Sequence, residues 1–242
     1  MLFFILSAVL IFKWARKLYG DTGAITALIL FAFSPTVITH SRFVTTDVAA
    51  LFGVLFATYF YIGYLKNQTG KNLLLASVFF GIALLCKFST FLLVPFFLIL
   101  GLIYGFVKNP RPPLRGSTSQ LRSSTPQSGS NLGVQLLSYG GKLKDAARTL
   151  GATILIFIIG FAVIVWPVYY FHTYNYPPER QHTDTQQLLL SYGNRNFADP
   201  MVWASDKPVI RAAAQYGLGL LMVTQRTVGG NTTYFLGEVS RF

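Results

Sequence analysis

Residues 48–65 read VAALFGVLFATYFYIGYL and contain no charged side chain. A helix of this length rises about 27 Å, close to the hydrocarbon thickness of a bilayer, about 30 Å. The run ends at Lys66, and Lys71 follows in the next polar turn. This pattern predicts a transmembrane helix that ends in a basic turn.

Five other apolar runs surround this stretch, and short polar turns or one long polar segment separate them. They are Leu2 to Phe12, Thr22 to Thr39, Asn72 to Leu85, Thr90 to Val107 and Leu150 to Phe171, the last interrupted by Pro167. The first run is short for a span, and the sequence ends abruptly in apolar and aromatic residues. We therefore predict an all-α polytopic transmembrane helical bundle, and we expect the sequence to be a fragment truncated at both ends.

The composition supports a membrane protein. Hydrophobic residues make up 52% of the chain and charged residues only 12%, against about 25% charged residues in soluble domains. The net charge of +12 comes from Lys and Arg between apolar runs, which argues against nucleic acid as a partner. The single cysteine excludes an internal disulfide, and no Cys or His spacing suits zinc. No cofactor is indicated, and a divalent cation is left open.

The basic turns give an orientation, because Lys and Arg accumulate in short cytoplasmic loops. Every span carries the chain to the other side, so alternate turns lie on the same face of the membrane. The basic turns are alternate turns, and we expect them to be cytoplasmic: Lys13 to Lys17, Lys66 to Lys71 and the segment after Val107. The turns at 40–47 and 86–89 and the chain after about residue 171 then lie outside. We predict a multi-pass protein of the cell (inner) membrane with its active face on the non-cytoplasmic side.

Four regions follow from this reading. Residues 1–109 form transmembrane helices, and 110–149 form a flexible basic cytoplasmic linker rich in Pro, Ser and Thr. Residues 150–171 form another span. Residues 172–242 form an external loop with short helices and an interfacial or re-entrant segment.

The external turn HSRFVTTD, residues 40–47, carries the most chemistry. Asp47 stands where a helix is about to enter lipid, with His40 and Arg42 beside it. Such a group suits a site that handles an anionic headgroup and a hydroxyl nucleophile. The alternative is that Thr45, Thr46 or Asp47 only caps the following helix, and both roles are compatible.

Lys87 is an exception to the orientation rule, because it lies on the expected external face between two apolar runs. It is either a cation that pairs with a lipid phosphate or a lysine that extends to the interface. Farther on, Arg180 and His182 are candidates for substrate binding, with a solvated charge cluster as the alternative.

Three motifs in order resemble the dolichyl-phosphate-mannose-protein mannosyltransferase family. They are Ser34 to Asp47, LLCKFS at residues 84–89, and YFLGEVS at residues 234–240. The resemblance implies the GT-C architecture, related to lipid A aminoarabinose transferases. It also implies an inverting hexosyl or mannosyl transfer from a polyprenyl-phosphate sugar donor to a hydroxyl of a protein or lipid acceptor, among membrane lipids and on the non-cytoplasmic face.

By this resemblance Asp47 is the catalytic residue, and Lys87, Arg42 and His40 bind the donor phosphate. Arg180, His182 and Glu238 are further candidates for substrate binding. The family's main carboxylate lies in a first external loop that would precede Met1, so we expect this chain alone to be inactive. The rival function is a membrane transporter or lipid flippase, which would place ionisable groups near the bilayer midplane rather than at helix ends.

Overall fold

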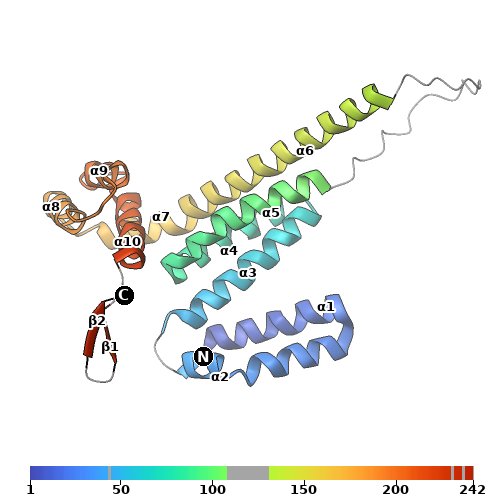
Figure 1. Ribbon diagram of the computed structural model, residues 1–242, viewed down its shortest axis with the longest axis horizontal. Coiled ribbons are helices and arrows are strands. Elements are labelled where there is room, and N and C mark those ends of the chain that lie inside the picture. Colours follow the sequence, from blue (N-terminus) through green and yellow to red (C-terminus); the bar gives the residue numbers. More distant parts are fainter. Residues whose placement is uncertain (43–44, 108–130, 230–231, 236–237, 242) are drawn as a thin grey trace, which may run out of the picture.

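The computed structural model describes residues 1–42, 45–107, 131–229, 232–235 and 238–241, and it describes side chains within 1–42, 45–107 and 141–226. The described part is a bundle of long helices with a cluster of shorter helices at one end (Figure 1).

The chain begins with a helical hairpin. Helix α1 (Leu2–Ala32) reverses at Gly20, whose φ of 74° lies in the left-handed region that glycine adopts without steric cost. The reversal brings the Phe4 and Phe31 rings to 5.2 Å. Helix α2 (Pro35–Arg42) follows at an angle of 56°. The predicted run at 2–12 lies in the first arm of the hairpin. The prediction of one continuous run over 22–39 is wrong, because the second arm ends at Ala32 and residues 35–39 belong to the bent helix α2.

The bundle core consists of α3 (Asp47–Lys66), α4 (Gly70–Cys86), α5 (Leu93–Val107) and α6 (Asn131–Gly160). Their apolar faces enclose fully buried side chains, the largest being Tyr61, Phe80, Phe97 and Ile156. The Tyr61 and Phe97 rings stack at 4.2 Å. The Tyr61 hydroxyl also donates to the Phe97 carbonyl and lies 2.8 Å from the Thr153 hydroxyl, so one side chain joins three helices.

The candidate span Gly141–Thr173 is irregular near its C-terminal end. A π-helical segment η2 (Phe161–Val165) separates α6 from α7 (Trp166–Thr173) and ends two residues before Pro167, which has no N–H to donate. Just before η2, α6 packs tightly on α4. A Cβ built on Gly81 would lie 2.5 Å from the Gly160 carbonyl oxygen, so the glycines allow the two backbones to touch.

Three described helical segments are long and apolar enough to cross a membrane, and the number is four if the bent pair α1 and α2 is counted as one span. The three are Asp47–Lys66, Phe88–Val107 and Gly141–Thr173, while Gly70–Cys86 is apolar but shorter. This agrees with the predicted polytopic helical bundle. Lys17, Lys66 and Asn72 meet at one end of the bundle, which we call the basic end, and Asp47 and Lys87 lie at the other.

The expected linker at 110–149 is wrong for residues 131–149, because α6 begins at Asn131. Ala146 and Thr149 are buried, and Ala146 packs against Gly105 of α5, so tertiary contact stabilises a helix in a stretch that the sequence suggested was polar. The rest of the linker, residues 108–130, lies outside the described residues.

The described chain after α7 forms three further helices, two of them short and the third 19 residues long. They are α8 (Pro178–Leu188), α9 (Arg195–Ala204) and α10 (Arg211–Gly229). Helix α10 packs against α7, α9 and the short 3-10 helix η1 (Phe88–Leu92). A hairpin of β1 (Thr232–Phe235) and β2 (Glu238–Arg241) follows, which the sequence analysis did not predict in an all-α chain.

Candidate functional site at the end of helices α3 and α4

Asp47 is the first residue of α3. Thr46 occupies the N-cap position but makes no side-chain capping hydrogen bond, so the expected threonine cap is absent there. The carboxylate of Asp47 instead lies in the first turn, where the positive end of the helix dipole favours a negative charge. The Asp47 carboxylate can therefore stabilise the start of α3 through the helix dipole while its two oxygens accept hydrogen bonds from other side chains.

Lys87 is held by the break between α4 and η1. Its backbone is extended, with φ −164° and ψ 140°, and this ends α4 at Cys86. The buried Thr90 hydroxyl lies 2.6 Å from the Ala83 carbonyl and 2.7 Å from the Lys87 carbonyl. The Lys87 carbonyl also accepts from the Thr90 backbone N–H at 3.1 Å, so the single hydroxyl proton is available to the Ala83 carbonyl in the last turn of α4. This turn directs the Lys87 side chain away from the α4 axis.

The two elements meet at an ion pair. Lys87 Nζ lies 2.5 Å from Asp47 Oδ1, and His40 Nδ1 from the end of α2 lies 3.2 Å from Asp47 Oδ2. The Thr45 hydroxyl lies 3.3 Å from the same His40 nitrogen. The side chains of Asp47, Lys87 and His40 are each about two fifths exposed, at 41%, 39% and 39%, so a substrate can reach them.

Helix α10 packs against η1, which begins directly after Lys87 in the chain. Phe88, next to Lys87 in the chain, packs on α10, with its ring 5.5 Å from the Tyr216 ring. A Cβ at Gly219 would lie 2.3 Å from the Phe88 ring, so α10 approaches η1 closely. A hollow of about 290 Å³ opens nearby between Leu85 of α4 and Tyr169 and His172 of α7.

Arg42 is not brought to Asp47. It ends α2 with an exposed side chain, and no ion pair or hydrogen bond to it occurs in the part of the chain that the structure describes. The structure thus groups Asp47 with two of the three residues expected at the donor phosphate, Lys87 and His40, and leaves Arg42 at the edge of the group.

The candidates in the helices after α7 have partners of their own. Arg180 Nε lies 3.8 Å from Asp184 Oδ2 on α8, and His182 Nδ1 lies 3.3 Å from the Ser205 hydroxyl. Among the described side chains neither contacts Asp47 or Lys87. Glu238 begins β2, and its side chain lies outside the described part.

One carboxyl group in this region titrates below its usual range. The hydrogen bond from Lys207 holds the pKa of Asp206 down, and burial opposes the effect. Lys207 also lies 5.9 Å from the centre of the Trp203 ring. Lys207 Nζ donates to Asp206 Oδ2, while Asp206 Oδ1 is buried without a hydrogen-bond partner among the described residues, so this local pair fits a structural role at the turn between α9 and α10.

Within the described residues, no group of three or more His, Cys, Asp and Glu side chains could hold a metal ion. The sequence analysis does not single out Thr90, Phe88 or Tyr216, although Thr90 holds the turn at Lys87 and Phe88 packs on Tyr216 of α10. Only the nearness of Thr90 and Phe88 to Lys87 could have suggested them, because nothing local connects Tyr216 to residues that precede it by more than one hundred positions.

Comparison with known families decides the class of protein. The model of the dolichyl-phosphate-mannose-protein mannosyltransferase family matches residues 1–121, half of the chain, including Asp47, Lys87, His40 and Arg42. The chain belongs to this family. Comparison with curated proteins and with solved structures gave no match.

Membership of the dolichyl-phosphate-mannose-protein mannosyltransferase family supports a glycosyltransferase, and the candidate spans support a multi-pass membrane protein. The family also implies, in general terms, a polyprenyl-phosphate-linked sugar donor. The matched region covers α1 to α5, and therefore both elements that form the ion pair.

Proposed function

We propose that this protein transfers a sugar from a polyprenyl-phosphate donor to an acceptor hydroxyl on the non-cytoplasmic face of the membrane. The observation that carries the proposal is the Asp47 carboxylate held between Lys87 and His40, from segments up to 40 residues apart. A carboxylate beside two groups able to bear positive charge supplies what transfer from a phosphate leaving group needs.

In this proposal Asp47 orients the acceptor hydroxyl or takes its proton. The acceptor oxygen attacks the anomeric carbon from the face opposite the phosphate, the bond from that carbon to the phosphate oxygen breaks, and the configuration inverts. Lys87 and His40 stabilise the negative charge left on the polyprenyl phosphate. Arg42, which follows His40 by two residues at the end of α2, contacts the donor phosphate from the edge of the site.

The position of the ion pair also supports this function over transport. Asp47 lies at the first turn of α3 and Lys87 just after the end of α4, so both are at helix ends on one side of the bundle. A transporter or flippase would instead require ionisable groups near the middle of broken helices. The basic end lies opposite, which supports a non-cytoplasmic site under the positive-inside rule.

The acceptor is proposed to be a protein or lipid hydroxyl, and the sugar a hexose such as mannose. Arg180 and His182 remain proposed substrate contacts, although they have partners within the external helices. They would contact the acceptor only if it extends from Asp47 over α10.

The test is transfer of radiolabelled sugar from a polyprenyl-phosphate donor in membranes of the source cells, with Asp47→Asn introduced into the chromosomal gene. We expect a loss of at least about 100-fold, since the amide can neither take a proton nor carry the charge. Asp199→Asn, which removes an exposed carboxylate paired with Arg195 on α9, is the matched control. Unchanged transfer by Asp47→Asn at normal protein levels would remove Asp47 from the mechanism.

A further inference from the structure

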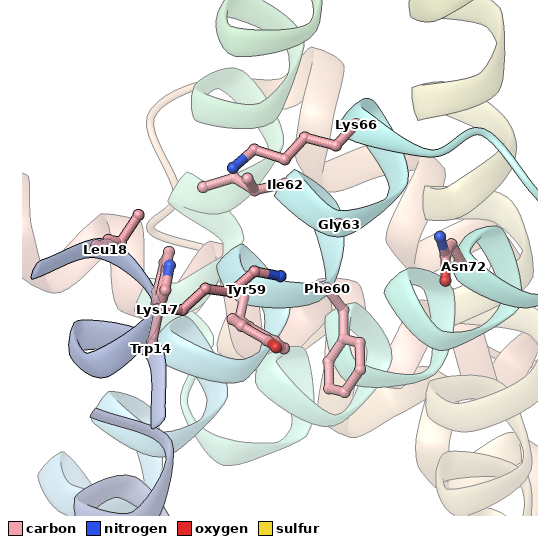
Figure 2. A pocket seen from close by; sticks show the side chains of 9 residues that line it. All are labelled: Trp14, Lys17, Leu18, Tyr59, Phe60, Ile62, Gly63, Lys66 and Asn72. Atoms are coloured by element: carbon pink, nitrogen blue, oxygen red, sulfur yellow. The ribbon is translucent and has the colours of Figure 1, made fainter. Parts of the chain in front are cut away.

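A second hollow lies at the basic end of the bundle, away from Asp47. It has a volume of about 200 Å³, and its walls come from α1, α3 and α4. Figure 2 shows Trp14 and Lys17 on α1 facing Tyr59 and Lys66 on α3, with Asn72 of α4 on the far side. The hollow is thus built by three helices and is not a feature of one surface loop.

Two ammonium groups line this hollow without a carboxylate to neutralise them. The acidic side chain closest in the α1 sequence, Asp21, is paired with Arg16 at 2.6 Å. No salt bridge to Lys17 or Lys66 is found among the side chains that the structure describes. The hollow therefore carries a net positive charge and suits an anion.

The remaining lining suits the interface of a membrane. The Trp14 and Tyr59 rings meet edge to face at 5.4 Å, and Phe60 and Ile62 complete the apolar wall. Trp and Tyr concentrate at the level of lipid headgroups, where one part of the ring contacts lipid and the other contacts water. The hollow adjoins the last turn of α3, where that helix would leave the bilayer.

We propose that this hollow binds the phosphate group of an anionic phospholipid, with Lys17 and Lys66 contacting the phosphate and the Trp14 and Tyr59 rings contacting the glycerol and upper acyl chain. The simpler role for Lys66 is to complement the negative C-terminal end of the α3 dipole. That role requires neither Lys17 nor a hollow. In Figure 2 the Lys66 side chain runs over Ile62 toward α1, away from the end of its own helix.

This proposal does not depend on the sugar transfer, because the hollow and the Asp47 site lie at opposite ends of the bundle. It also goes beyond the general preference of basic loops for the cytoplasmic side. That preference counts every Lys and Arg equally, whereas a built hollow distinguishes Lys17 and Lys66 from Lys13 and Lys71, which do not line it.

The test uses fluorescence of the full chain in bilayers that contain brominated lipid, which quenches tryptophan on contact. The contribution of Trp14 is the fluorescence of the unmodified chain minus the fluorescence of the Trp14→Phe variant. Brominated phosphatidylglycerol should quench this signal more strongly than brominated phosphatidylcholine at equal mole fraction. Removing both charges in Lys17→Gln/Lys66→Gln should weaken the association by about 100-fold, because each lysine loses a charge-assisted contact with the phosphate that contributes about tenfold. Lys17→Arg/Lys66→Arg should keep the preference.

The control is Lys13→Gln/Lys71→Gln, which removes the same charge from the same end of the bundle but outside the hollow. It should retain most of the preference for phosphatidylglycerol. Equal losses in the two double variants would show that only total charge matters and would overturn the site, as would equal quenching by the two lipids in the unmodified chain. Displacement of the lipid by millimolar inorganic phosphate would show that the hollow takes a free anion, which also contradicts the proposal.

Discussion

Lys87 Nζ lies 2.5 Å from Asp47 Oδ1, and this contact joins the end of α4 to the beginning of α3. The two helices are consecutive and antiparallel, so the end of one and the start of the other lie on the same side of the bundle. A charged pair that is about two fifths exposed adds little to stability, about 0 to 1 kcal/mol. Its position beside His40 and α10 argues for a functional role.

Substituting Lys87 should affect transfer far more than folding. Lys87→Gln should lower the transfer rate by about 100-fold, the usual effect of removing one donor that stabilises charge in the transition state. Lys87→Arg should restore part of the rate. Sugar transfer and the melting temperature in detergent should be measured on the same preparations. A fall in melting temperature that accounts for the lost activity would show that Lys87 is only structural.

Substitutions of His40 and Arg42 should change different kinetic parameters. His40→Ala removes a group 3.2 Å from Asp47 and should lower kcat by about tenfold, which corresponds to one charge-assisted hydrogen bond of about 1.5 kcal/mol. Arg42→Ala, at the edge of the site, should mainly raise the KM for the donor. Steady-state transfer at varied donor concentration measures both. A purely kcat effect for Arg42→Ala would place its side chain at the reacting atoms, contrary to the proposal.

The buried hydroxyl of Tyr61 should stabilise the bundle. Tyr61→Phe removes its contacts with the Phe97 carbonyl and the Thr153 hydroxyl, and should cost about 0.6 kcal/mol, the average for hydrogen bonds between membrane helices. Thermal unfolding in detergent of Tyr61→Phe, Thr153→Val and the double variant gives the coupling between them. Tyr170→Phe, with its ring 41% exposed, is the control. Strictly additive effects would mean that the Tyr61 and Thr153 hydroxyls do not interact.

The contact between Gly81 and Gly160 should tolerate no side chain. In Gly81→Ala the new methyl group would lie 2.5 Å from the Gly160 carbonyl oxygen, so α4 and α6 must separate at a cost of about 1 to 3 kcal/mol. Gly151→Ala on the exposed face of α6, with no atom within 4 Å of the new Cβ, should be neutral or slightly stabilising. The melting temperatures in detergent compare them. Equal values would indicate that the helices are not in contact there.

Much of the fold follows from local composition. An uncharged run such as residues 48–65 must satisfy its backbone polar groups within one helix if it enters lipid. The sequence also predicts Asp47 and Lys87 on the same side of the bundle, because the turns that contain them alternate with the basic turns. The start of α6 could not be predicted from local composition, because Ala146 and Thr149 are buried only by packing against α5.

By itself, the sequence determined that the chain forms a helical membrane bundle, which turns are basic, and which short motifs carry chemistry, because hydropathy and charge act locally along the chain. Only the tertiary structure decided that His40 joins Asp47 and Lys87 while Arg42 does not, and that Tyr216 lies behind Phe88. The reason is geometric. Hydrogen bonds and ion pairs depend on differences of a few tenths of an ångström, which are set by the kink after α1, the break after Cys86 and the packing of helices distant in the chain.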